Sequence, residues 1–177
     1  MAEDPGATAP STRRLVLLRH AKSSWADDLP DLERPLSARG RRDAAEAGHW
    51  LAAHVGRPDL VLCSTAVRTR QTWARAGEAE PDLLGPAQVR FEAAIYAAWP
   101  DTLLELARRL PVEVTTAVLV GHAPGLPDLA ERLNRANGDR PVGDFPTSAV
   151  ATFAVSGAWG DLGPGSAALT AYAVPRG

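Results

Sequence analysis

The stretch Leu15-Val16-Leu17-Leu18-Arg19-His20-Ala21 guides the interpretation of the rest of this chain. Its four apolar residues, bounded by polar ones, predict a buried strand. The histidine stands just beyond the carboxyl end of that strand, which is where open α/β sheets form their ligand crevice. We therefore expect His20 to face a binding site.

Two further stretches repeat this arrangement. Val118-Leu119-Val120-Gly121-His122 is a second apolar run that ends in a histidine, and Leu60-Val61-Leu62-Cys63-Ser64 leads into Arg68. Because the carboxyl ends of parallel strands meet in one crevice, these segments are predicted to converge with Arg19 and His20. Guanidinium groups bind phosphate oxygens in pairs, and neutral imidazole is a good nucleophile for phosphorus. The sequence thus predicts one site for a phosphoryl group.

Length and composition set the broad class of the protein. The chain has 177 residues, of which 45% are hydrophobic and 23% are charged, as is usual for a soluble globular protein. A net charge of -2 argues against a nucleic-acid partner, and a single cysteine excludes an internal disulfide. Residues 1–12 lack the apolar core of a signal peptide, and no stretch is long enough to span a membrane. We therefore expect a cytoplasmic protein with a flexible tail at 1–12 and a single domain at 13–177.

The apolar pattern predicts strands and helices that alternate along most of the chain. Strands are expected at 14–18, 59–63, 89–91, 115–120, 149–155 and 167–174. Helices are expected from the N-cap Ser37, after strand 59–63 as far as Gly77, from Pro100, and over 125–137. This alternation predicts a three-layer α/β/α sandwich around a mostly parallel sheet. The short link between the last two strands predicts an antiparallel strand at one edge.

The ionisation of His20 also follows from its neighbours. Adjacent positive charge favours the neutral form of an imidazole, so the arginines should keep His20 deprotonated at neutral pH. One ring nitrogen must hold its proton against an acceptor so that the other stays free to attack. We expect a backbone carbonyl to be that acceptor.

At this point several motifs carry a family resemblance. They are Arg19-His20-Ala21-Lys22-Ser23-Ser24-Trp25, Glu33-Arg34-Pro35-Leu36-Ser37 with Gly40, Ser64-Thr65-Ala66-Val67-Arg68-Thr69-Arg70-Gln71-Thr72, Val120-Gly121-His122 and Phe145-Pro146-Thr147-Ser148-Ala149. In this order they resemble the histidine phosphatase superfamily, which also contains the phosphoglycerate mutases. The last motif is similar to one found in the smaller, SixA-type phosphohistidine phosphatases.

The resemblance implies a mechanism and a set of site residues. It implies that His20 is transiently phosphorylated and that Arg19, Arg68 and His122 complete the phosphate pocket. It also implies a phosphoglycerate mutase-like fold that needs no metal or other cofactor. Alanine at position 21 departs from the glycine that usually follows the histidine, a change that the SixA-like branch tolerates.

The same resemblance suggests two further residues that bind the substrate. Ser23 is expected to donate to a phosphate oxygen, and Arg34 is expected at the rim of the pocket.

The general acid is harder to assign. Larger relatives place a glutamate after the third strand, where this chain has Glu92, and Asp101 is a weaker alternative. A leaving imidazole departs more easily than an alkoxide, so phosphohistidine has less need of the ~10²–10⁴-fold gain that a positioned acid supplies. We therefore favour phosphohistidine on a protein as the substrate. A phosphatase of small phosphomonoesters with Glu92 as acid is the alternative, and a phosphate-binding module without catalysis is a third.

Other candidate residues have a structural interpretation. His49 and His54 lie within a predicted helix with no phosphate-binding company. Cys63 is too close to Arg68 for a cysteine phosphatase loop and is expected to be a small buried hydrophobic residue. The acidic loop at 27–33 is expected to be solvated, although its charge would repel acidic substrates.

Overall fold

The computed structural model describes residues 12–25, 28–135 and 142–177. Except for Thr12, the predicted tail lies outside these residues. Six strands form one sheet, namely β1 Arg13–Arg19, β2 Leu60–Ser64, β3 Gln88–Glu92, β4 Thr116–Gly121, β5 Val150–Val155 and β6 Ala167–Ala173. The strands that begin as apolar runs lie within about one residue of their predicted bounds, because a buried run ends where polar residues begin.

The sheet is mostly parallel, as predicted. Its order is β3-β2-β4-β1-β5-β6, and the first four of these strands run parallel to one another. The antiparallel strand is β5, which pairs with β1 on one side and with β6 on the other. The prediction that the last two strands form an antiparallel pair at one edge of the sheet is therefore confirmed, with β6 as the outermost strand.

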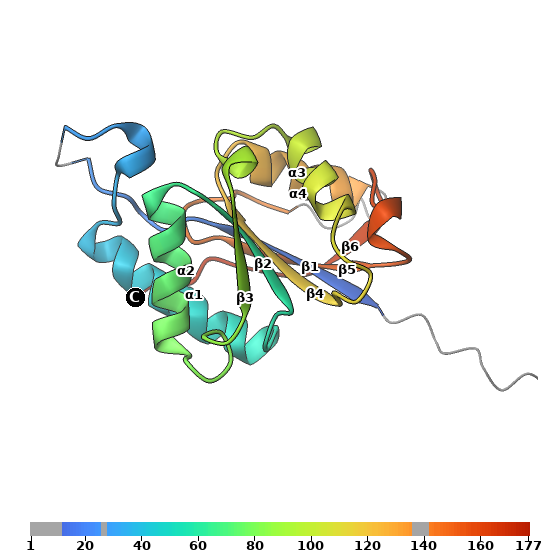
Figure 1. Ribbon diagram of the computed structural model, residues 1–177, viewed down its shortest axis with the longest axis horizontal. Helices are drawn as coiled ribbons and strands as arrows, with labels where there is room; N and C mark the ends of the chain where they lie inside the picture. The colour runs from blue at the N-terminus through green and yellow to red at the C-terminus, as the bar shows by residue number, and fades with distance from the viewer. Residues whose placement is uncertain (1–11, 26–27, 136–141) are drawn as a thin grey trace, which may run out of the picture.

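Helices cover both faces of the sheet (Figure 1). The helices α1 Ala38–His54 and α2 Val67–Ala79 lie on one face, and α3 Pro100–Arg108 and α4 Gly125–Asn134 lie on the other. Among the residues that the structure describes, the connections contain the short 3-10 helices η1 Asp31–Glu33, η2 Ala93–Ile95 and η4 Trp159–Asp161. The three-layer prediction is confirmed.

The alternation of side chains along β1 explains why both faces carry helices. Val16 and Leu18 join the core beneath α1 and α2, whereas Leu15 and Leu17 join the core beneath α3 and α4. All four are at most 1% exposed, so β1 is buried from both sides. Central parallel strands read as continuous apolar runs for this reason.

The beginning of α1 is fixed against the segment that follows His20. The N-cap Ser37 accepts a hydrogen bond from Gly40 N at 3.0 Å, and its own backbone N–H donates to Lys22 O at 2.9 Å. A Cβ atom at position 40 would lie 1.9 Å from Lys22 O. Only glycine permits this close approach, and the contact orders the backbone beside His20.

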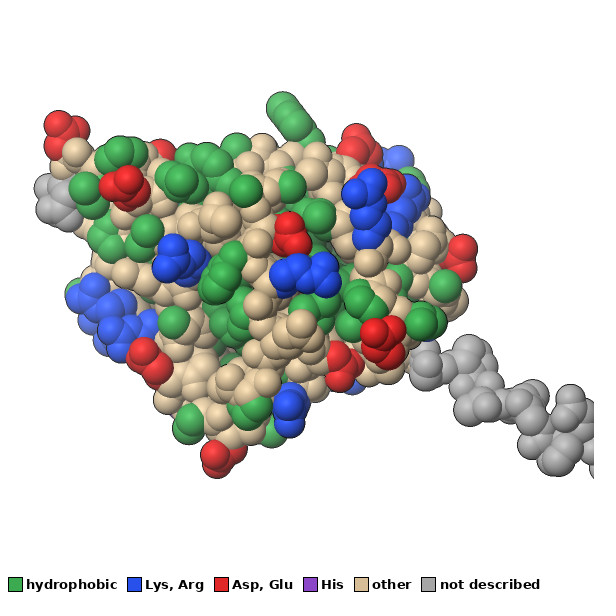
Figure 2. Space-filling model, in the orientation of Figure 1, with side chains coloured by type: hydrophobic (Ala, Val, Ile, Leu, Met, Phe, Trp, Pro, Cys, Tyr) green, Lys and Arg blue, Asp and Glu red, His purple; other side chains and the backbone are tan. Residues whose placement is uncertain are grey.

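The visible surface carries no dominant sign of charge. On the face drawn in Figure 2, acidic and basic side chains are interspersed with apolar ones. Within the described ranges, no helix combines the length and apolar character that crossing a membrane demands.

Candidate active site

A small cavity brings the two predicted histidines together at the carboxyl ends of β1 and β4. Its volume is about 190 Å³. The residues that line it are His20, Asp31, Arg68, Tyr96, Ala97, His122 and Ala123. Three larger surface hollows, of about 300, 360 and 500 Å³, have no histidine in their linings.

Backbone pairing explains why the histidines meet. Arg19 and Gly121 are partners in the parallel register of β1 and β4, so His20 and His122 are the next residues on each strand. His20 N donates to Gly121 O at 3.0 Å, and the two imidazole centroids lie 5.2 Å apart. The convergence predicted from two strand ends is therefore present.

His20 presents a free nitrogen to the cavity. Its Nδ1 lies 2.8 Å from the carbonyl oxygen of Ala21. A carbonyl only accepts, so Nδ1 must carry the proton and Nε2 keeps its lone pair. The predicted carbonyl acceptor is that of the very next residue.

The pKa of His20 is lowered to about 4, chiefly because burial disfavours the imidazolium. The nearby charges of Arg68, Arg19 and Arg34 lower this pKa further. The sequence predicts a neutral His20 because of the arginines. In the structure, burial lowers this pKa more than any of the arginines does.

His122 is held by a hydroxyl at the end of β2. Its Nε2 lies 2.8 Å from Ser64 Oγ, which also accepts a hydrogen bond from Ala66 N at 3.3 Å. We assign the Ser64 proton to the bond with His122, because this leaves Oγ with one donor and one acceptor role. The remaining ring proton then lies on Nδ1, which is buried without a hydrogen-bond partner. Such a donor is suited to a phosphate oxygen.

The pKa of His122 is lowered to about 3, first by burial and then by His20 and Arg68. Both imidazoles are therefore neutral at neutral pH, and the positive charge of the site comes from arginines.

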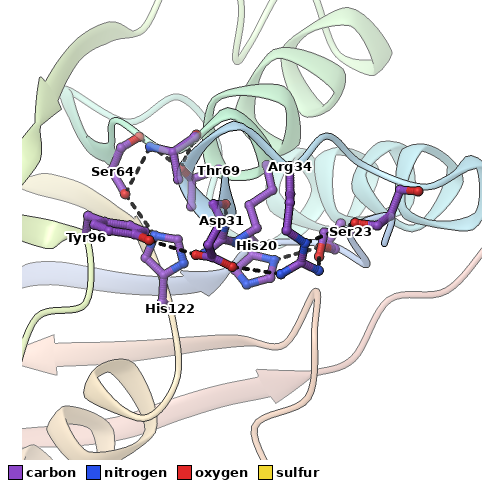
Figure 3. Close-up of polar contacts among 12 residues, drawn as sticks. His20, Ser23, Asp31, Arg34, Ser64, Thr69, Tyr96 and His122 are labelled. Carbon is purple, nitrogen blue, oxygen red and sulfur yellow. Dashed lines mark hydrogen bonds and ion pairs between the residues drawn. The ribbon is translucent and has the colours of Figure 1, made fainter. Parts of the chain in front are cut away.

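Asp31 joins two of these arginines at the mouth of the cavity (Figure 3). Its Oδ1 lies 2.8 Å from Arg34 Nη1, and its Oδ2 lies 2.9 Å from Arg68 Nη2. The Tyr96 hydroxyl donates to Oδ2 at 2.8 Å. Asp31 is exposed, as predicted for the loop at 27–33, and it is also held at the cavity by two guanidinium groups.

Arg19 is anchored by the late motif Phe145-Pro146-Thr147-Ser148-Ala149. Its Nη1 donates to Phe145 O at 2.7 Å, and its backbone N donates to Ala149 O at 3.0 Å. Ser148 N donates to His20 O at 3.1 Å, so the motif fixes the nucleophile's backbone as well. Arg19 Nε is buried without a partner and is a second donor suited to an anion. Arg19 is not one of the lining residues, although its charge acts on both histidines.

Ser23 and Arg34 lie behind Asp31. Arg34 Nη2 donates to Ser23 Oγ at 2.6 Å, and both residues are buried. The Arg34 guanidinium also lies 3.1 Å above the centre of the Trp25 ring. Neither residue lines the cavity, so the rim position of Arg34 and the donation from Ser23 to a phosphate oxygen stay predictions.

Neither candidate acid lines the cavity. Glu92 ends β3 beside Ser64, and its Oε1 lies 3.9 Å from Arg90 Nη1. Asp101 is exposed in α3 and pairs with Arg132. The one carboxyl group among the lining residues is Asp31, whose pKa is held well below its usual range by the Tyr96 hydrogen bond and by Arg34 and Arg68.

The structural interpretations of the remaining candidates are consistent with their surroundings. Cys63 is fully buried, and burial raises the pKa of its thiol to about 12, so no thiolate nucleophile forms there. His49 pairs with Glu80, and His54 bonds to the carbonyl oxygen of Trp50. Neither of these histidines lines the cavity.

Comparisons with known proteins agree with this geometry. Residues 15–89 match the sequence profile of the histidine phosphatase superfamily (branch 1). An uncharacterized protein from Mycobacterium tuberculosis is 42% identical over 165 residues, which cover 90% of this chain and 100% of that protein. SixA from Nakamurella multipartitia, a proposed phosphohistidine phosphatase, is 35% identical with a TM-score of 0.81, over 93% of this chain and 96% of its own. SixA from Agrobacterium tumefaciens is 29% identical with a TM-score of 0.76, over 92% and 98%.

The chain belongs to the histidine phosphatase superfamily. It falls in the SixA-type branch, and its activity is that of a phosphatase.

Two polar residues of this histidine phosphatase's cavity were not predicted to line it, although Asp31 lies in the acidic loop that was expected to repel acidic substrates. Asp31 lies three positions before Arg34, and that spacing within a turn was the available signal for an ion pair between them. Tyr96 follows η2, and its ring lies edge-on to His122 with centroids 5.6 Å apart. No periodic sequence pattern predicts the position of Tyr96, because tertiary packing alone decides where side chains in this connection point.

Proposed function

We propose that this histidine phosphatase removes the phosphoryl group from phosphohistidine on a protein, through a transient phosphohistidine on His20. The observation that carries the proposal is the tautomer of His20. With Nδ1–H donated to Ala21 O, the Nε2 lone pair is free in a cavity that also holds Arg68 and His122. A module that only bound phosphate would not need this arrangement.

In the first step, His20 Nε2 attacks phosphorus and the bond from phosphorus to the substrate imidazole breaks. The electron pair of that bond goes to the leaving nitrogen. A substrate ring protonated on its other nitrogen leaves as neutral imidazole, and the positive charge passes to the His20 ring, whose Nδ1–H remains on Ala21 O. The step needs no proton donor.

In the second step, a water oxygen attacks the phosphorus of phospho-His20. The bond from phosphorus to Nε2 breaks, its electron pair returns to Nε2, and both water protons stay on the released dihydrogen phosphate. Arg19, Arg68 and His122 Nδ1–H are the donors that neutralise the transferring group in both steps.

Two features support a protein substrate. The cavity of about 190 Å³ holds little more than a phosphoryl group and a ring, so most of the substrate must lie outside it. Trp25, stacked on Arg34, is 75% exposed, and Trp99, two residues beyond the lining Ala97, is 71% exposed. Exposed aromatic side chains of this kind are typical of protein-binding surfaces.

The absence of a usable acid among the lining residues favours phosphohistidine over alkyl phosphates. Asp31 is ionised and cannot protonate an alkoxide. The role of Glu92 as an acid for phosphomonoesters stays a prediction, as does a cytoplasmic location.

The test compares turnover of a phosphohistidine-bearing protein with turnover of a panel of alkyl phosphates. We expect kcat/KM to be at least a hundredfold higher for phosphohistidine. Faster turnover of any alkyl phosphate would contradict the proposal. If Glu92→Gln then slowed the turnover of alkyl phosphates more than that of phosphohistidine, the phosphomonoesterase alternative would replace the proposed function.

A further inference from the structure

The position of Asp31 is unusual for an anion-binding site. A carboxylate from η1 lines the same cavity as His20 and His122, although the cavity's chemistry favours negatively charged ligands. Three donors hold the carboxylate in place, namely Arg34 Nη1 at 2.8 Å, Arg68 Nη2 at 2.9 Å and the Tyr96 hydroxyl at 2.8 Å. A fourth donor, Arg68 Nη1, bonds to the backbone oxygen of Asp31. Its charge is fixed as well as its position, because these donors keep it ionised.

Asp31 changes the total charge that a substrate meets. The guanidinium groups of Arg19, Arg34 and Arg68 supply three positive charges around the cavity, and both histidines are neutral. The Asp31 carboxylate removes one of these charges and leaves two. A phosphoryl dianion matches that remainder, so a second anionic group on the substrate would find no compensating charge.

Asp31 also lies on the solvent-exposed part of the cavity lining. In-line displacement places the leaving group opposite the attacking nitrogen of His20. His20 is 8% exposed, whereas the Asp31 side chain in the same lining is 47% exposed, so Asp31 lies nearer the solvent than the nucleophile does. Tyr96 lines the same cavity and bonds to Asp31 (Figure 3).

We infer that Asp31 is a specificity-determining residue, which favours leaving groups that carry a positive charge or an N–H and rejects leaving groups that carry an anion. A protonated imidazole ring beside this carboxylate is stabilised in the form that departs as neutral imidazole. A leaving group with its own carboxylate meets a like charge there instead. The inference rests on the proposed function for its natural substrate, but the selectivity itself is measurable without phosphohistidine.

The test uses three phenyl phosphates, with a para trimethylammonium, nitro or carboxylate group, because phenolates depend less on an acid than alkoxides do. For the unmodified protein we expect kcat/KM to fall in that order. In Asp31→Asn the ratio between the trimethylammonium and carboxylate substrates should shrink at least tenfold. The matched control is Glu33→Gln, which removes the same charge from an exposed position in the same 3-10 helix and should leave the ratio unchanged.

Two further measurements keep the test decisive if Asp31→Asn displaces Arg68. In Tyr96→Phe the Asp31 carboxylate keeps its charge. The ratio of kcat/KM between the trimethylammonium and carboxylate substrates should therefore persist even if both values fall. In the unmodified protein, salt should narrow the ratio, because screening weakens the interaction between Asp31 and the substituent. A ratio that is the same in Asp31→Asn as in the unmodified protein, or one indifferent to salt, would overturn the inference.

The two proposals fail in different ways. If phosphohistidine protein is not turned over but the ratio depends on Asp31, the proposed substrate is wrong and the selectivity stands. If phosphohistidine is turned over and the ratio does not depend on Asp31, the selectivity is wrong and the proposed function stands.

Discussion

Individual residues of this site gain their chemistry from single hydrogen bonds. Ala21 O fixes the proton of His20 on Nδ1, and Ser64 Oγ orients His122. Neither Ala21 O nor Ser64 Oγ takes part in the reaction, but each decides which ring nitrogen of its histidine faces the cavity. The positioning groups therefore contribute to the activity by fixing the tautomer of each histidine.

Ser64→Ala tests this point at His122. Removing the hydroxyl takes away the donor to Nε2, so the ring proton should no longer be confined to Nδ1. We expect kcat/KM to fall by roughly fivefold to tenfold, which corresponds to about 1 kcal/mol for one hydrogen bond. The structural readout is the tautomer of His122, measured from its ring ¹⁵N chemical shifts. An unchanged tautomer in Ser64→Ala would show that Ser64 does not orient the ring.

The sequence is informative about residues that follow buried strands and less informative about residues in connections. His20 and His122 stand at strand ends, so sheet geometry alone predicts that they meet. Asp31 and Tyr96 belong to connections, and the direction of such side chains depends on packing that no local pattern reveals. The pairing of Asp31 with Arg68 could be predicted only by knowing where Arg68 lies, and that position is fixed by α2.

At the scale of elements, the site depends on how closely α1 approaches the segment after β1. The N-terminus of α1 bonds to Lys22 O through Ser37, and Gly40 makes room for the contact. The helix start was predictable from the N-cap serine, whereas the need for glycine is visible only in three dimensions.

Gly40→Ala should destabilise the fold and displace the backbone beside His20. The new Cβ would meet Lys22 O at 1.9 Å, and a backbone atom cannot swing aside as a flexible side chain can. We expect a loss of about 1–3 kcal/mol in the free energy of unfolding, measured by urea denaturation.

The matched control is Gly77→Ala in α2, where the nearest atoms to the new Cβ are 3.9 Å away. This change should be neutral or stabilising by about 0.5–1 kcal/mol, because alanine is the better helix former. Equal effects of the two substitutions would mean that the contact with Lys22 is unimportant.

Strand boundaries were more predictable than strand order. The apolar runs mark β1, β2 and β4 closely, but the sequence does not say that β5 inserts between β1 and β6. The order of the strands depends on which crossover each helix makes, and no local sequence pattern indicates that crossover.

For the whole molecule, two buried neutral histidines link stability to pH. Their folded-state pKa values are about 4 for His20 and about 3 for His122, against an ordinary value of 6.5. Both values are lowered, so their contribution to stability is complete above pH 6.5 and is lost as the pH falls toward 4. As the pH falls, these histidines bind protons in the unfolded chain before they do so in the folded protein, and this favours unfolding.

We expect the free energy of unfolding to fall between pH 7.5 and pH 5 by about 2 kcal/mol for each of these histidines. His20→Asn should remove its share of this dependence. His49→Gln is the control, because Glu80 raises the pKa of the exposed His49 and gives it the opposite sign. A pH dependence that His20→Asn leaves intact would contradict the assignment of a buried neutral ring.

The central claim is that His20 Nε2 carries the phosphoryl group during turnover, and rapid quench with radiolabelled phosphoramidate tests it most directly. The account predicts an acid-labile, alkali-stable label on His20, which is absent in His20→Ala and retained in the control His49→Ala. Label on another residue, or no labelled protein while phosphate is released, would contradict it.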